Sequence, residues 1–466
     1  MQDRREFHDQ RAPHRAREAS RWYHQLLKRY FRFLVPEGAR VLELGCGLGD
    51  LLAAVKPSRG VGVDFSPSVV SLARERHPGL EFHIADALEF NIEAGETFDY
   101  ILISDLVNDV TDVQALFARA RQHAHPHTRL VVNFFNNLWR PILAMAASCG
   151  WKAPTLLQNW LALEDVRNLL HLAGWETIRY DSRILWPVRT PIWEELCNRW
   201  LAPLVPWSCL AVVAVARPKP EPRPDRHYRC TVVIPARNEA GNIEAAIERT
   251  PELGLGTEFL FIEGHSKDNT WEAIQETIRR HPERNIRALK QTTVGKGGAV
   301  REAFAAATGD ILFILDADLT MPPEELPKFY EVIRSGLGDF VNGVRLVYPM
   351  EAQSMQFLNM IANKLFGIAF SWLMGQPVKD TLCGTKVLFR EHYESIARNR
   401  KYFGDFDPFG DFDLLFGASK LNLRIVDLPI RYAARTYGST NINRWRHGWL
   451  LLRMTAFAAR RLKFIS

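Results

Sequence analysis

The sequence predicts an α/β protein with two domains, each built on a parallel sheet. With 466 residues the chain is too long for one ordinary hydrophobic core. Apolar runs of strand length alternate with helical stretches in both halves. Between the halves, residues 216–228 (ARPKPEPRPDRHY) hold four prolines and many charges, a composition that continues neither a helix nor a central strand. We therefore expect a linker at residues 218–229.

Composition narrows the class of protein. A hydrophobic content of 47% with 24% charged residues is typical of a soluble globular chain. The longest uncharged stretch has 17 residues (200–216), which is shorter than the roughly 20 residues of a membrane span. No apolar signal segment opens the sequence. The six cysteines lack metal-site spacing, which favours reduced thiols. These observations predict a cytoplasmic protein.

Residues 1–35 are predicted to form a helical cap on the first domain, which we place at residues 36–217. In RWYHQLLKRYFRFLVPEG, large apolar side chains recur at helical spacing. They are Trp22, Leu26, Leu27, Tyr30 and Phe33. This pattern favours a helix packed on the sheet over a nucleic-acid surface, and no nucleic-acid partner is expected.

The first candidate ligand site follows the run RVLELGCGLGD. An apolar strand breaks here into Gly45, Gly47 and Gly49 and leads into a helix, an arrangement that lets backbone approach a ligand at the carboxyl end of the strand. The next strand ends at Asp64, whose carboxylate can accept hydrogen bonds from both hydroxyls of a ribose. A third run ends at Asp86-Ala87, and a fourth ends at Ser104-Asp105.

Two alternatives compete at this glycine turn, a dinucleotide site and a turn with no ligand. A dinucleotide site would have its third glycine where Asp50 stands. Glu43, just before the turn, adds a negative charge that suits a sulfonium cation better than a pyrophosphate.

The ordered series Glu43, Asp64 and Asp86, each ending a successive strand, resembles the class I S-adenosylmethionine-dependent methyltransferases over about Pro36 to Pro218. The resemblance implies a Rossmann-like sheet with S-adenosylmethionine as cofactor. It places Gly45 and Gly47 beside the methionine part, Asp64 on the ribose, and Asp86 with Ala87 at the adenine.

No residue after the fourth predicted strand identifies a methyl acceptor. The segment NFFNNLWRP brings together four side chains that either contact the acceptor or are plain loop residues. They are Asn136, Asn137, Trp139 and Arg140. His83 and His171 are expected to be structural, so no general base for a hydroxyl is evident.

The second candidate site lies in residues 230–442. GDILFILDADLT is a strand-like run that ends in Asp316 and Asp318, an Asp-X-Asp motif. Mg²⁺ or Mn²⁺ prefers oxygen ligands, and a sugar nucleotide supplies further ones from its diphosphate. The metal would neutralise charge on the departing nucleoside diphosphate. The alternative, in which both aspartates cap the next helix, leaves Asp316 unexplained.

This half resembles the family 2 glycosyltransferases of the GT-A fold, and among them the polyprenyl-phosphate mannosyl- and glucosyltransferases. The resemblance runs from about Arg229 to Asn443 on PARNE, EGHSKDNT, GKGGAVREAF, DADLT and RYAARTYGSTN. It implies a UDP- or GDP-sugar donor held by a set of nucleotide-sugar-binding residues, with Asp318 and Asp316 also binding the metal. That set is Pro235, Arg237, Glu239, Glu263, Lys296, Asp316, Asp318, Arg345 and Arg435.

Two departures from this pattern bear on substrate. Glu263-Gly264 stands where many members carry two aspartates, which leaves the base, uridine or guanosine, undecided. Thr440-Asn441 replaces the usual Lys-Leu and removes a cation near a lipid phosphate.

The two halves together resemble bacterial fusions of a methyltransferase with a glycosyltransferase, on the runs QPVKDTLCGTKVLFR and GDFDPFGDFDLLFGASKLNLRIVDLPIRY. The second run places four carboxylates within residues 405–413, too many to be buried unpaired. Asp413, with Asp411 as second choice, stands where an inverting enzyme would hold its catalytic base. A phosphate acceptor would need no base.

The last segment, residues 443–466, is predicted to be a basic amphipathic helix. Residues 428–466 contain eight Lys and Arg and no Asp or Glu. Peripheral contact with an anionic membrane and simple packing on the domain both remain open. In residues 355–375, large apolar side chains recur at helical spacing, a stripe that we expect to be core. They are Phe357, Ile361, Leu365, Ile368 and Trp372.

We therefore expect a bifunctional enzyme that transfers a sugar to a lipid-phosphate or glycan acceptor and a methyl group from S-adenosylmethionine. It would be cytoplasmic, with a peripheral place on the inner face of the membrane if the basic helix binds lipid. The alternative is a glycosyltransferase with a non-catalytic S-adenosylmethionine-binding regulatory domain. The sequence does not identify the sugar or either acceptor.

Overall fold

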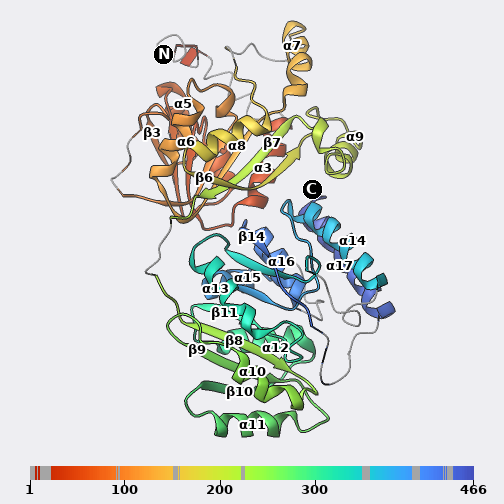
Figure 1. Ribbon diagram of the computed structural model, residues 1–466. Helices are drawn as coiled ribbons and strands as arrows, with labels where there is room; N and C mark the ends of the chain where they lie inside the picture. The colour runs from red at the N-terminus through yellow and green to blue at the C-terminus, as the bar shows by residue number, and fades with distance from the viewer. Residues whose placement is uncertain are drawn as a thin grey trace. The chain divides into compact units, whose positions relative to one another are not determined.

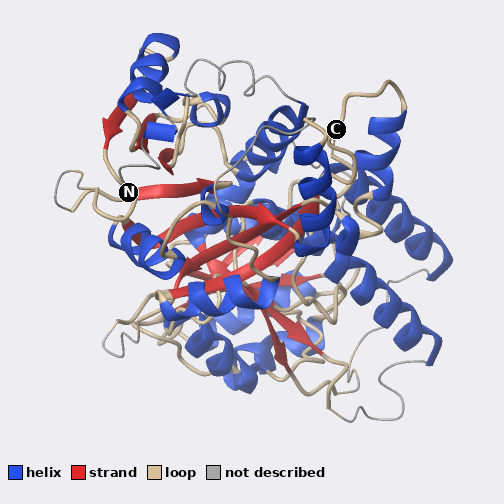
Figure 2. Ribbon diagram, turned by 90° about the horizontal axis from the view of Figure 1, so that it is seen from above, coloured by secondary structure: helices blue, strands red, loops and turns tan. Residues whose placement is uncertain are grey.

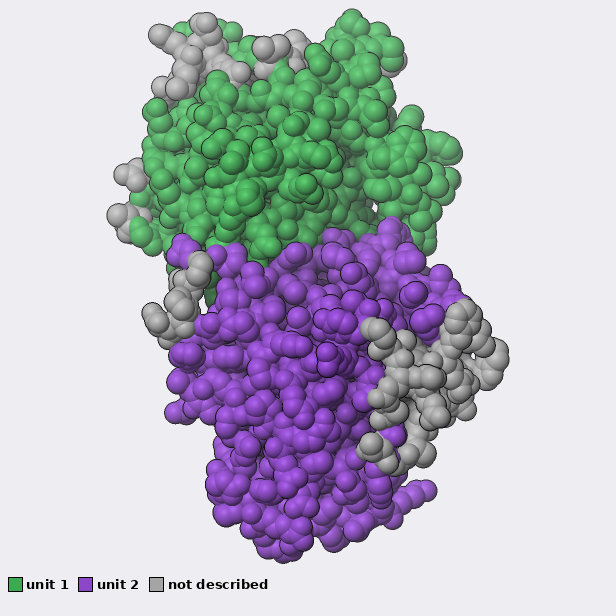
Figure 3. Space-filling model, viewed as in Figure 1, with its two compact units in different colours: residues 1–219, 463–466 green, residues 220–462 purple. Residues whose placement is uncertain are grey.

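A computed structural model of the chain divides into two compact units, coloured separately in Figure 3. Unit 1 holds residues 1–219 and 463–466, and unit 2 holds residues 220–462. The structure describes residues 6–465 except 8, 11–21, 91, 93–94, 151–155, 157, 222–225, 349–356, 401–409, 434, 436 and 438–443.

Unit 1 is a seven-stranded sheet with helices around it (Figures 1 and 2). Its strands are β1 (Arg40–Leu44), β2 (Arg59–Asp64), β3 (Glu81–Ile84), β4 (Phe98–Ser104), β5 (Ala124–Phe135), β6 (Trp175–Arg183) and β7 (Ala211–Pro218). Its helices are α3 (Trp22–Leu34), α4 (Asp50–Ala54), α5 (Pro67–Arg76), α6 (Val113–Gln122), α7 (Arg140–Ser148), α8 (Leu163–Leu172) and α9 (Trp193–Glu195). The strand order is β3-β2-β1-β4-β5-β7-β6.

The first five strands of this sheet pair in parallel, and β7 pairs antiparallel with both β5 and β6. β1, β2 and β4 are buried along nearly their whole length, as their continuous apolar sequences require when helices cover both faces. The chain leaves β1 toward β2 on one side and returns to β4 on the other. The carboxyl end of β1 is therefore the switch point at which α/β sheets bind ligands.

Unit 2 is a second seven-stranded sheet. Its strands are β8 (Cys230–Ala236), β9 (Thr257–Glu263), β10 (Asn285–Lys290), β11 (Ile311–Ile314), β12 (Phe340–Val344), β13 (Lys386–Phe389) and β14 (Ile425–Pro429). Its helices are α10 (Ile243–Arg249), α11 (Thr270–Arg280), α12 (Gly295–Ala306), α13 (Leu326–Arg334), α14 (Phe357–Met374), α15 (Arg390–Arg398), α16 (Asp411–Lys420) and α17 (Arg444–Leu462).

The strand order of unit 2 is β10-β9-β8-β11-β13-β12-β14. β10, β9, β8 and β11 are parallel, whereas β13 runs antiparallel between β11 and β12. The switch point of this sheet lies between β8 and β11. The predicted fold class, two α/β domains, is confirmed, although each sheet is mixed rather than wholly parallel.

α14 and α17 lie against each other in unit 2 (Figure 1). The prediction that the stripe along residues 355–375 is core was wrong for three of its described members on α14, which face solvent, whereas Trp372 is partly buried. Ile361, Leu365 and Ile368 are 39%, 62% and 69% exposed. Helical spacing shows that these residues share a face, but it does not show that anything covers the face. No helix in the described part of the chain has the length and apolarity needed to cross a bilayer.

Unit 1 includes the residues that follow α17. Lys463 Nζ lies 2.6 Å from Asp181 Oδ1 on β6, and the carbonyl of Lys463 accepts a 2.6 Å hydrogen bond from Arg183 Nη1. Tyr30, on the confirmed helix α3, donates its hydroxyl to Asp181 Oδ2 at 2.5 Å. Asp181, Arg183 and Lys463 are all buried. A buried ionic cluster therefore joins residues from both ends of the sequence.

Candidate active sites

In unit 1 the glycine turn after β1 is held by Asp64. Gly45, Gly47 and Gly49 all have positive φ, which glycine adopts without strain. The Asp64 carboxylate, at the end of β2, accepts hydrogen bonds from the backbone N–H of Gly47 and of Ser66, each 3.0 Å long. Asp64, at the carboxyl end of β2, therefore fixes the glycine turn.

Glu43 is buried within β1, with 2% of its surface exposed. Its Oε2 atom has no hydrogen-bond partner among the described residues. Burial raises the pKa of Glu43 well above its ordinary value, and the nearby carboxylates of Asp64 and Asp50 raise it further. A backbone hydrogen bond from Leu52 acts in the opposite direction on this pKa. A cationic ligand group would offset the buried negative charge.

Asp86 and Ala87 follow β3, which is paired with β2. Asp86 is partly buried and accepts a 2.9 Å hydrogen bond from the backbone N–H of Leu88, while Ala87 is buried. The predicted cofactor residues thus stand at the ends of three adjacent parallel strands.

The segment that holds the candidate methyl-acceptor contacts is bonded to the turn that precedes β7. Asn136 Nδ2 donates to the carbonyl oxygens of Trp207 and Cys209, and Trp139 Nε1 donates to that of Ser208. The hydrogen bonds of these two side chains are therefore explained by the structure of the loop, without a methyl acceptor.

A polar cluster that sequence reasoning did not assign lies just after β4. Asp105 Oδ1 accepts hydrogen bonds from the Tyr23 hydroxyl, at 2.7 Å, and from Asn133 Nδ2, at 2.6 Å. Burial raises the pKa of Asp105, although His24, Tyr23 and Asn133 act in the opposite direction. The only local signal was that Asp105 ends the fourth strand, since Tyr23 is far away in the sequence.

In unit 2, Asp316 lies two residues after the end of β11 and forms an ion pair with Lys296 on α12. Lys296 Nζ lies 2.6 Å from Asp316 Oδ1. Burial acts against ionisation of Asp316, but the charge and hydrogen bond of Lys296 outweigh it, so the pKa of Asp316 is lowered. Gly384 closes over this pair: a Cβ there would lie 2.0 Å from Asp316 Oδ2. A side chain at this position would have to displace the pair.

Asp318 pairs with Arg435, and the same guanidinium also contacts Glu239. Arg435 Nη2 is 2.6 Å from Asp318 Oδ2, and Nη1 is 2.7 Å from Glu239 Oε1. Asp318 Oδ1 accepts from the hydroxyl and the backbone N–H of Thr320. Burial raises the pKa of Glu239, partly offset by Arg435. The structure thus brings together residues from the first, fourth and last of the quoted motifs.

Three more of the residues predicted to bind the nucleotide sugar, Pro235, Arg237 and Glu263, lie at the ends of β8 and β9. Ala236, which follows Pro235, is the register partner of Glu263. The Glu263 carboxylate accepts a 2.5 Å hydrogen bond from the backbone N–H of Ser266, and Arg237 is exposed. Three non-glycine residues of this edge have positive φ, a conformation that clusters at functional sites. They are Asn238, His265 and Leu319.

Arg345 makes a two-pronged ion pair with Asp380, at 2.7 and 2.8 Å. Asp380 is fully buried and also accepts from Asn363 Nδ2 at 2.8 Å. Burial opposes the charge on Asp380, but Arg345 lowers its pKa to about 2. The sequence analysis placed Arg345 among the nucleotide-sugar-binding residues and did not predict this partner.

Asp413 is buried on α16 between two arginines. Its Oδ2 lies 2.8 Å from Arg400 Nε and 3.4 Å from Arg301 Nε. Gly410, which precedes α16, lies against Gly297 of α12: a Cβ on Gly410 would be 2.8 Å from the Gly297 Cα. The start of α16 is therefore close to Lys296. The side chain of Asp411, the second catalytic candidate, lies outside the described residues.

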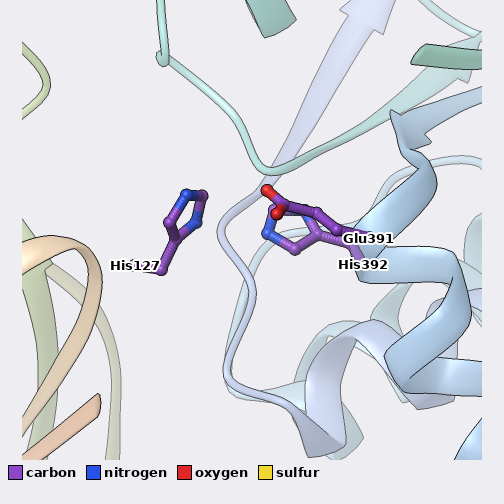
Figure 4. Close-up of side chains that lie close together, drawn as sticks. All are labelled: His127, Glu391 and His392. Carbon is purple, nitrogen blue, oxygen red and sulfur yellow. The ribbon is translucent and has the colours of Figure 1, made fainter. Parts of the chain in front are cut away.

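Other groups of potential metal ligands lie elsewhere. Glu244, Glu248 and His281 form a cluster on α10 and after α11 that includes neither residue of the Asp-X-Asp motif. Figure 4 shows Glu391 and His392 of unit 2 with His127 of unit 1. Because the positions of the two units relative to one another are not determined, we assign no site to these three side chains.

Two protein-family models match the chain. Residues 231–403 match the family 2 glycosyl transferases, and residues 42–130 match a methyltransferase domain. The chain joins a methyltransferase domain to a family 2 glycosyltransferase domain. The resemblance predicted from the strand-end motifs is confirmed in both halves, and units 1 and 2 are called the methyltransferase and glycosyltransferase units below.

Curated relatives match a little under half of the chain. A dolichol-phosphate mannosyltransferase of Pyrococcus furiosus is 29% identical over 223 residues, which are 46% of this chain and 59% of the relative. An undecaprenyl-phosphate 4-deoxy-4-formamido-L-arabinose transferase of Klebsiella pneumoniae is 26% identical over 46% of this chain and 62% of its own length. The chain thus spans about three fifths of the length of these relatives.

Two solved structures are similar to parts of this chain. Glucosyl-3-phosphoglycerate synthase from Mycobacterium tuberculosis, in complex with Mn²⁺, UDP and glucosyl-3-phosphoglycerate, is 20% identical with a TM-score of 0.38, covering 50% of this chain and 80% of its own. An S-adenosylmethionine-dependent methyltransferase from Mesorhizobium loti is 20% identical with a TM-score of 0.32, covering 40% and 95%.

Proposed function

We propose that the glycosyltransferase unit transfers a sugar from a UDP- or GDP-sugar to a lipid phosphate or glycan, with Mg²⁺ or Mn²⁺, and that the methyltransferase unit transfers a methyl group from S-adenosylmethionine. The observation that carries the first activity is the convergence of Asp316, Asp318, Glu239, Lys296 and Arg435 at the switch point between β8 and β11.

The Asp-X-Asp residues suit a hard cation. Carboxylate oxygens are the ligands that Mg²⁺ and Mn²⁺ prefer. Each of these carboxylates has a basic partner, Lys296 or Arg435. A metal bound at Asp318 would take over the neutralising role of Arg435, whose guanidinium would then be available for a donor phosphate. The metal, when bound, stabilises the charge that develops on the leaving diphosphate.

The roles of the other residues follow from their places at this edge. Pro235 and Arg237 after β8, and Glu263 at the end of β9, would surround the base and ribose of the donor. Asp413 is the candidate base for a hydroxyl acceptor, with Asp411 second. Arg345 would act through Asp380, by fixing the loop that carries Gly384, in addition to any contact with phosphate.

The methyltransferase unit fits S-adenosylmethionine by its donor set. Asp64 holds the glycine turn, and the unpaired Oε2 of buried Glu43 stands beside it. The cofactor, when bound, supplies an electrophilic methyl group on sulfur. The adenine would lie at Asp86 and Ala87.

We place the chain in the cytoplasm, at the inner face of a membrane. The reason for the membrane contact is that the glycosyltransferase unit carries an exposed apolar surface with basic residues. We call it the α14–α17 surface. Its exposed side chains are Ile361, Leu365, Ile368, Trp449 and Leu452. Neither helix contains an acidic residue, and Lys364 and Arg453 are exposed on them. Anionic lipid attracts such basic residues by about 1 kcal/mol each, and an apolar face adds to this.

The glycosyltransferase activity is tested by release of nucleoside diphosphate from UDP-glucose and GDP-mannose with Mn²⁺ and undecaprenyl phosphate. Asp318→Asn should lower turnover by about 10²–10³-fold, because it removes a charged metal ligand. Asp310→Asn is the matched control, since this exposed aspartate lies at the opposite end of β11. Equal turnover in the two variants, with and without chelator, contradicts the assignment.

The membrane contact is tested by flotation of the full chain with anionic liposomes at low salt. A variant carrying Leu365→Ser, Trp449→Ser and Leu452→Ser should stay in the soluble fraction while the parent floats. These substitutions are preferable to a truncation, because Lys463 is part of the methyltransferase unit. Flotation of both forms, or of neither, contradicts the proposal.

A further inference from the structure

The cluster after β4 lies directly beside the glycine turn of the methyltransferase unit. Leu106, the residue after Asp105, lies against Gly45: a Cβ on Gly45 would be 3.1 Å from Leu106 Cδ1. Asn133 lies on the neighbouring strand, where it is the register partner of Ser104. Asp105 and Asn133 are therefore at the same sheet edge as the proposed cofactor residues.

The hydrogen bonds of this cluster leave two oxygen atoms open. Both bonds to Asp105 end on Oδ1, so among the described residues no hydrogen bond is made to its Oδ2. Asn133 is fully buried, and its Oδ1 has no partner in the described part of the chain. A buried amide oxygen without a hydrogen bond is unfavourable, because it has lost its contact with water. A ligand that donates a hydrogen bond would satisfy this oxygen.

Aromatic rings stand next to these oxygens. The rings of Tyr23 and Phe135 have centroids 6.0 Å apart, and those of Phe135 and Trp160 are 6.3 Å apart. All three side chains are partly exposed. An aromatic face carries negative charge density and attracts the C–H groups of a sugar ring. The cluster thus combines an apolar platform with acceptors for hydroxyl groups.

We propose that Tyr23, Asp105 and Asn133 form the methyl-acceptor site, that the acceptor is a sugar hydroxyl, and that Asp105 is its general base. The proposal rests on the proposed S-adenosylmethionine site of the same unit. It assigns the general base for methyl transfer, which could not be identified from the sequence. It also argues against a purely regulatory role for the methyltransferase unit.

The reaction balances without a further reactant. The hydroxyl oxygen attacks the methyl carbon as its proton passes to Asp105 Oδ2. The oxygen–carbon bond forms while the carbon–sulfur bond breaks, and sulfur keeps the electron pair as a neutral thioether. Tyr23 and Asn133 hold the carboxylate in place through Oδ1, and Tyr23 remains a donor because burial and the charge of Asp105 raise its pKa well above the ordinary value.

Asp105 has a backbone conformation that supports a functional role. Its φ is 58°, in the left-handed region that non-glycine residues seldom adopt. Such strain persists where the surroundings impose it and is common at active sites.

The test uses the full chain with labelled S-adenosylmethionine and four acceptor probes: methyl α-D-mannopyranoside, methyl β-D-glucopyranoside, methyl α-L-rhamnopyranoside and phenol. Binding of S-adenosylhomocysteine is measured first by calorimetry. Glycoside binding in its presence is then measured by calorimetry for the parent, Asp105→Asn and Trp160→Ala. Asp109→Asn is the matched control, because it removes one charge nearby and keeps the oxygen that accepts from Gln158.

We expect the parent to methylate at least one glycoside. The methyltransferase activity of Asp105→Asn should be lower by about 10²-fold or more. The affinities of this variant for the glycoside and for S-adenosylhomocysteine should stay within threefold of the parent's. Trp160→Ala should weaken glycoside binding about tenfold, and Asp109→Asn should stay within threefold of the parent. Full activity of Asp105→Asn, or methylation of phenol alone or of no glycoside, overturns the proposal. Failure to bind S-adenosylhomocysteine instead overturns the proposed cofactor site.

Discussion

The guanidinium of Arg435 lies 2.6 Å from Asp318, a residue 117 positions earlier in the chain. Through its other nitrogen it also reaches Glu239. One side chain from the last part of the glycosyltransferase unit therefore neutralises two carboxylates from the ends of β8 and β11. This arrangement makes Arg435 and a divalent metal competitors for Asp318.

The first prediction follows from this competition. Arg435→Ala should bind Mn²⁺ about tenfold more tightly in the absence of donor, because two carboxylates lose their counter-charge. Donor turnover should nevertheless fall about 10²-fold if Arg435 stabilises the departing diphosphate. Calorimetric Mn²⁺ titration measures the first effect. Arg249→Ala, which breaks an exposed pair with Glu324, is the control and should change neither quantity. Unchanged Mn²⁺ affinity in Arg435→Ala counts against the competition.

A second prediction concerns the buried pair of Arg345 and Asp380. The folded-state pKa of Asp380 is about 2, below the ordinary value of 3.8. Its carboxylate therefore stabilises the fold fully above pH 4, and this contribution is lost as pH falls toward 2. Asp380→Asn should cost about 3–5 kcal/mol at pH 7, since it leaves the guanidinium uncompensated. Urea unfolding between pH 3 and 7 measures it.

The exposed Asp310→Asn serves as the control for the second prediction and should stay within about 0.5 kcal/mol of the parent. A free energy of unfolding for Asp380→Asn that matches the parent at pH 7 would show that the pair contributes little.

The third prediction concerns cofactor recognition. Asp64→Asn keeps an oxygen that can accept from the glycine turn, but it loses the negative charge. Affinity for S-adenosylhomocysteine should fall about tenfold or more, because hydrogen bonds to charged groups contribute roughly 1.5–3 kcal/mol. Calorimetry with S-adenosylhomocysteine and with NADH measures both alternatives. Preferred binding of NADH, or unchanged affinity of the variant, goes against the assignment.

The fourth prediction uses the raised pKa of Asp105. A carboxyl whose folded-state pKa lies above its unfolded value favours the folded state when protonated and costs stability when ionised. Asp105→Asn should therefore melt at a higher temperature than the parent at pH 7, with a gap that narrows as pH falls toward 4. Thermal unfolding at several pH values measures the gap. A lower melting temperature for the variant at pH 7 would assign Asp105 a structural role.

Sequence reasoning succeeded where the signal is local. An apolar run that stops at a glycine or a carboxylate marks the end of a parallel strand, so the pattern alone was enough to place Gly45, Asp64 and Asp316 at sheet edges. The parallel order of the strands then brings these ends together.

The contacts between distant residues could not be predicted. Tyr23 meets Asp105 across 82 positions, and Arg345 meets Asp380 across 35. Nothing in the spacing of either pair indicates a contact. The face of α14 shows a second limit, because helical periodicity identifies Leu365 and Ile368 as neighbours without showing whether a partner covers them.

The cluster of Lys463 with Asp181 and Arg183 has a consequence for biosynthesis. Translation reaches Lys463 only after the whole of residues 220–462 has been synthesised. Until then Asp181 lacks its ammonium partner, and Arg183 lacks the carbonyl that it bonds in the finished fold. The methyltransferase unit therefore gains these contacts only after the sequence of the glycosyltransferase unit has been synthesised.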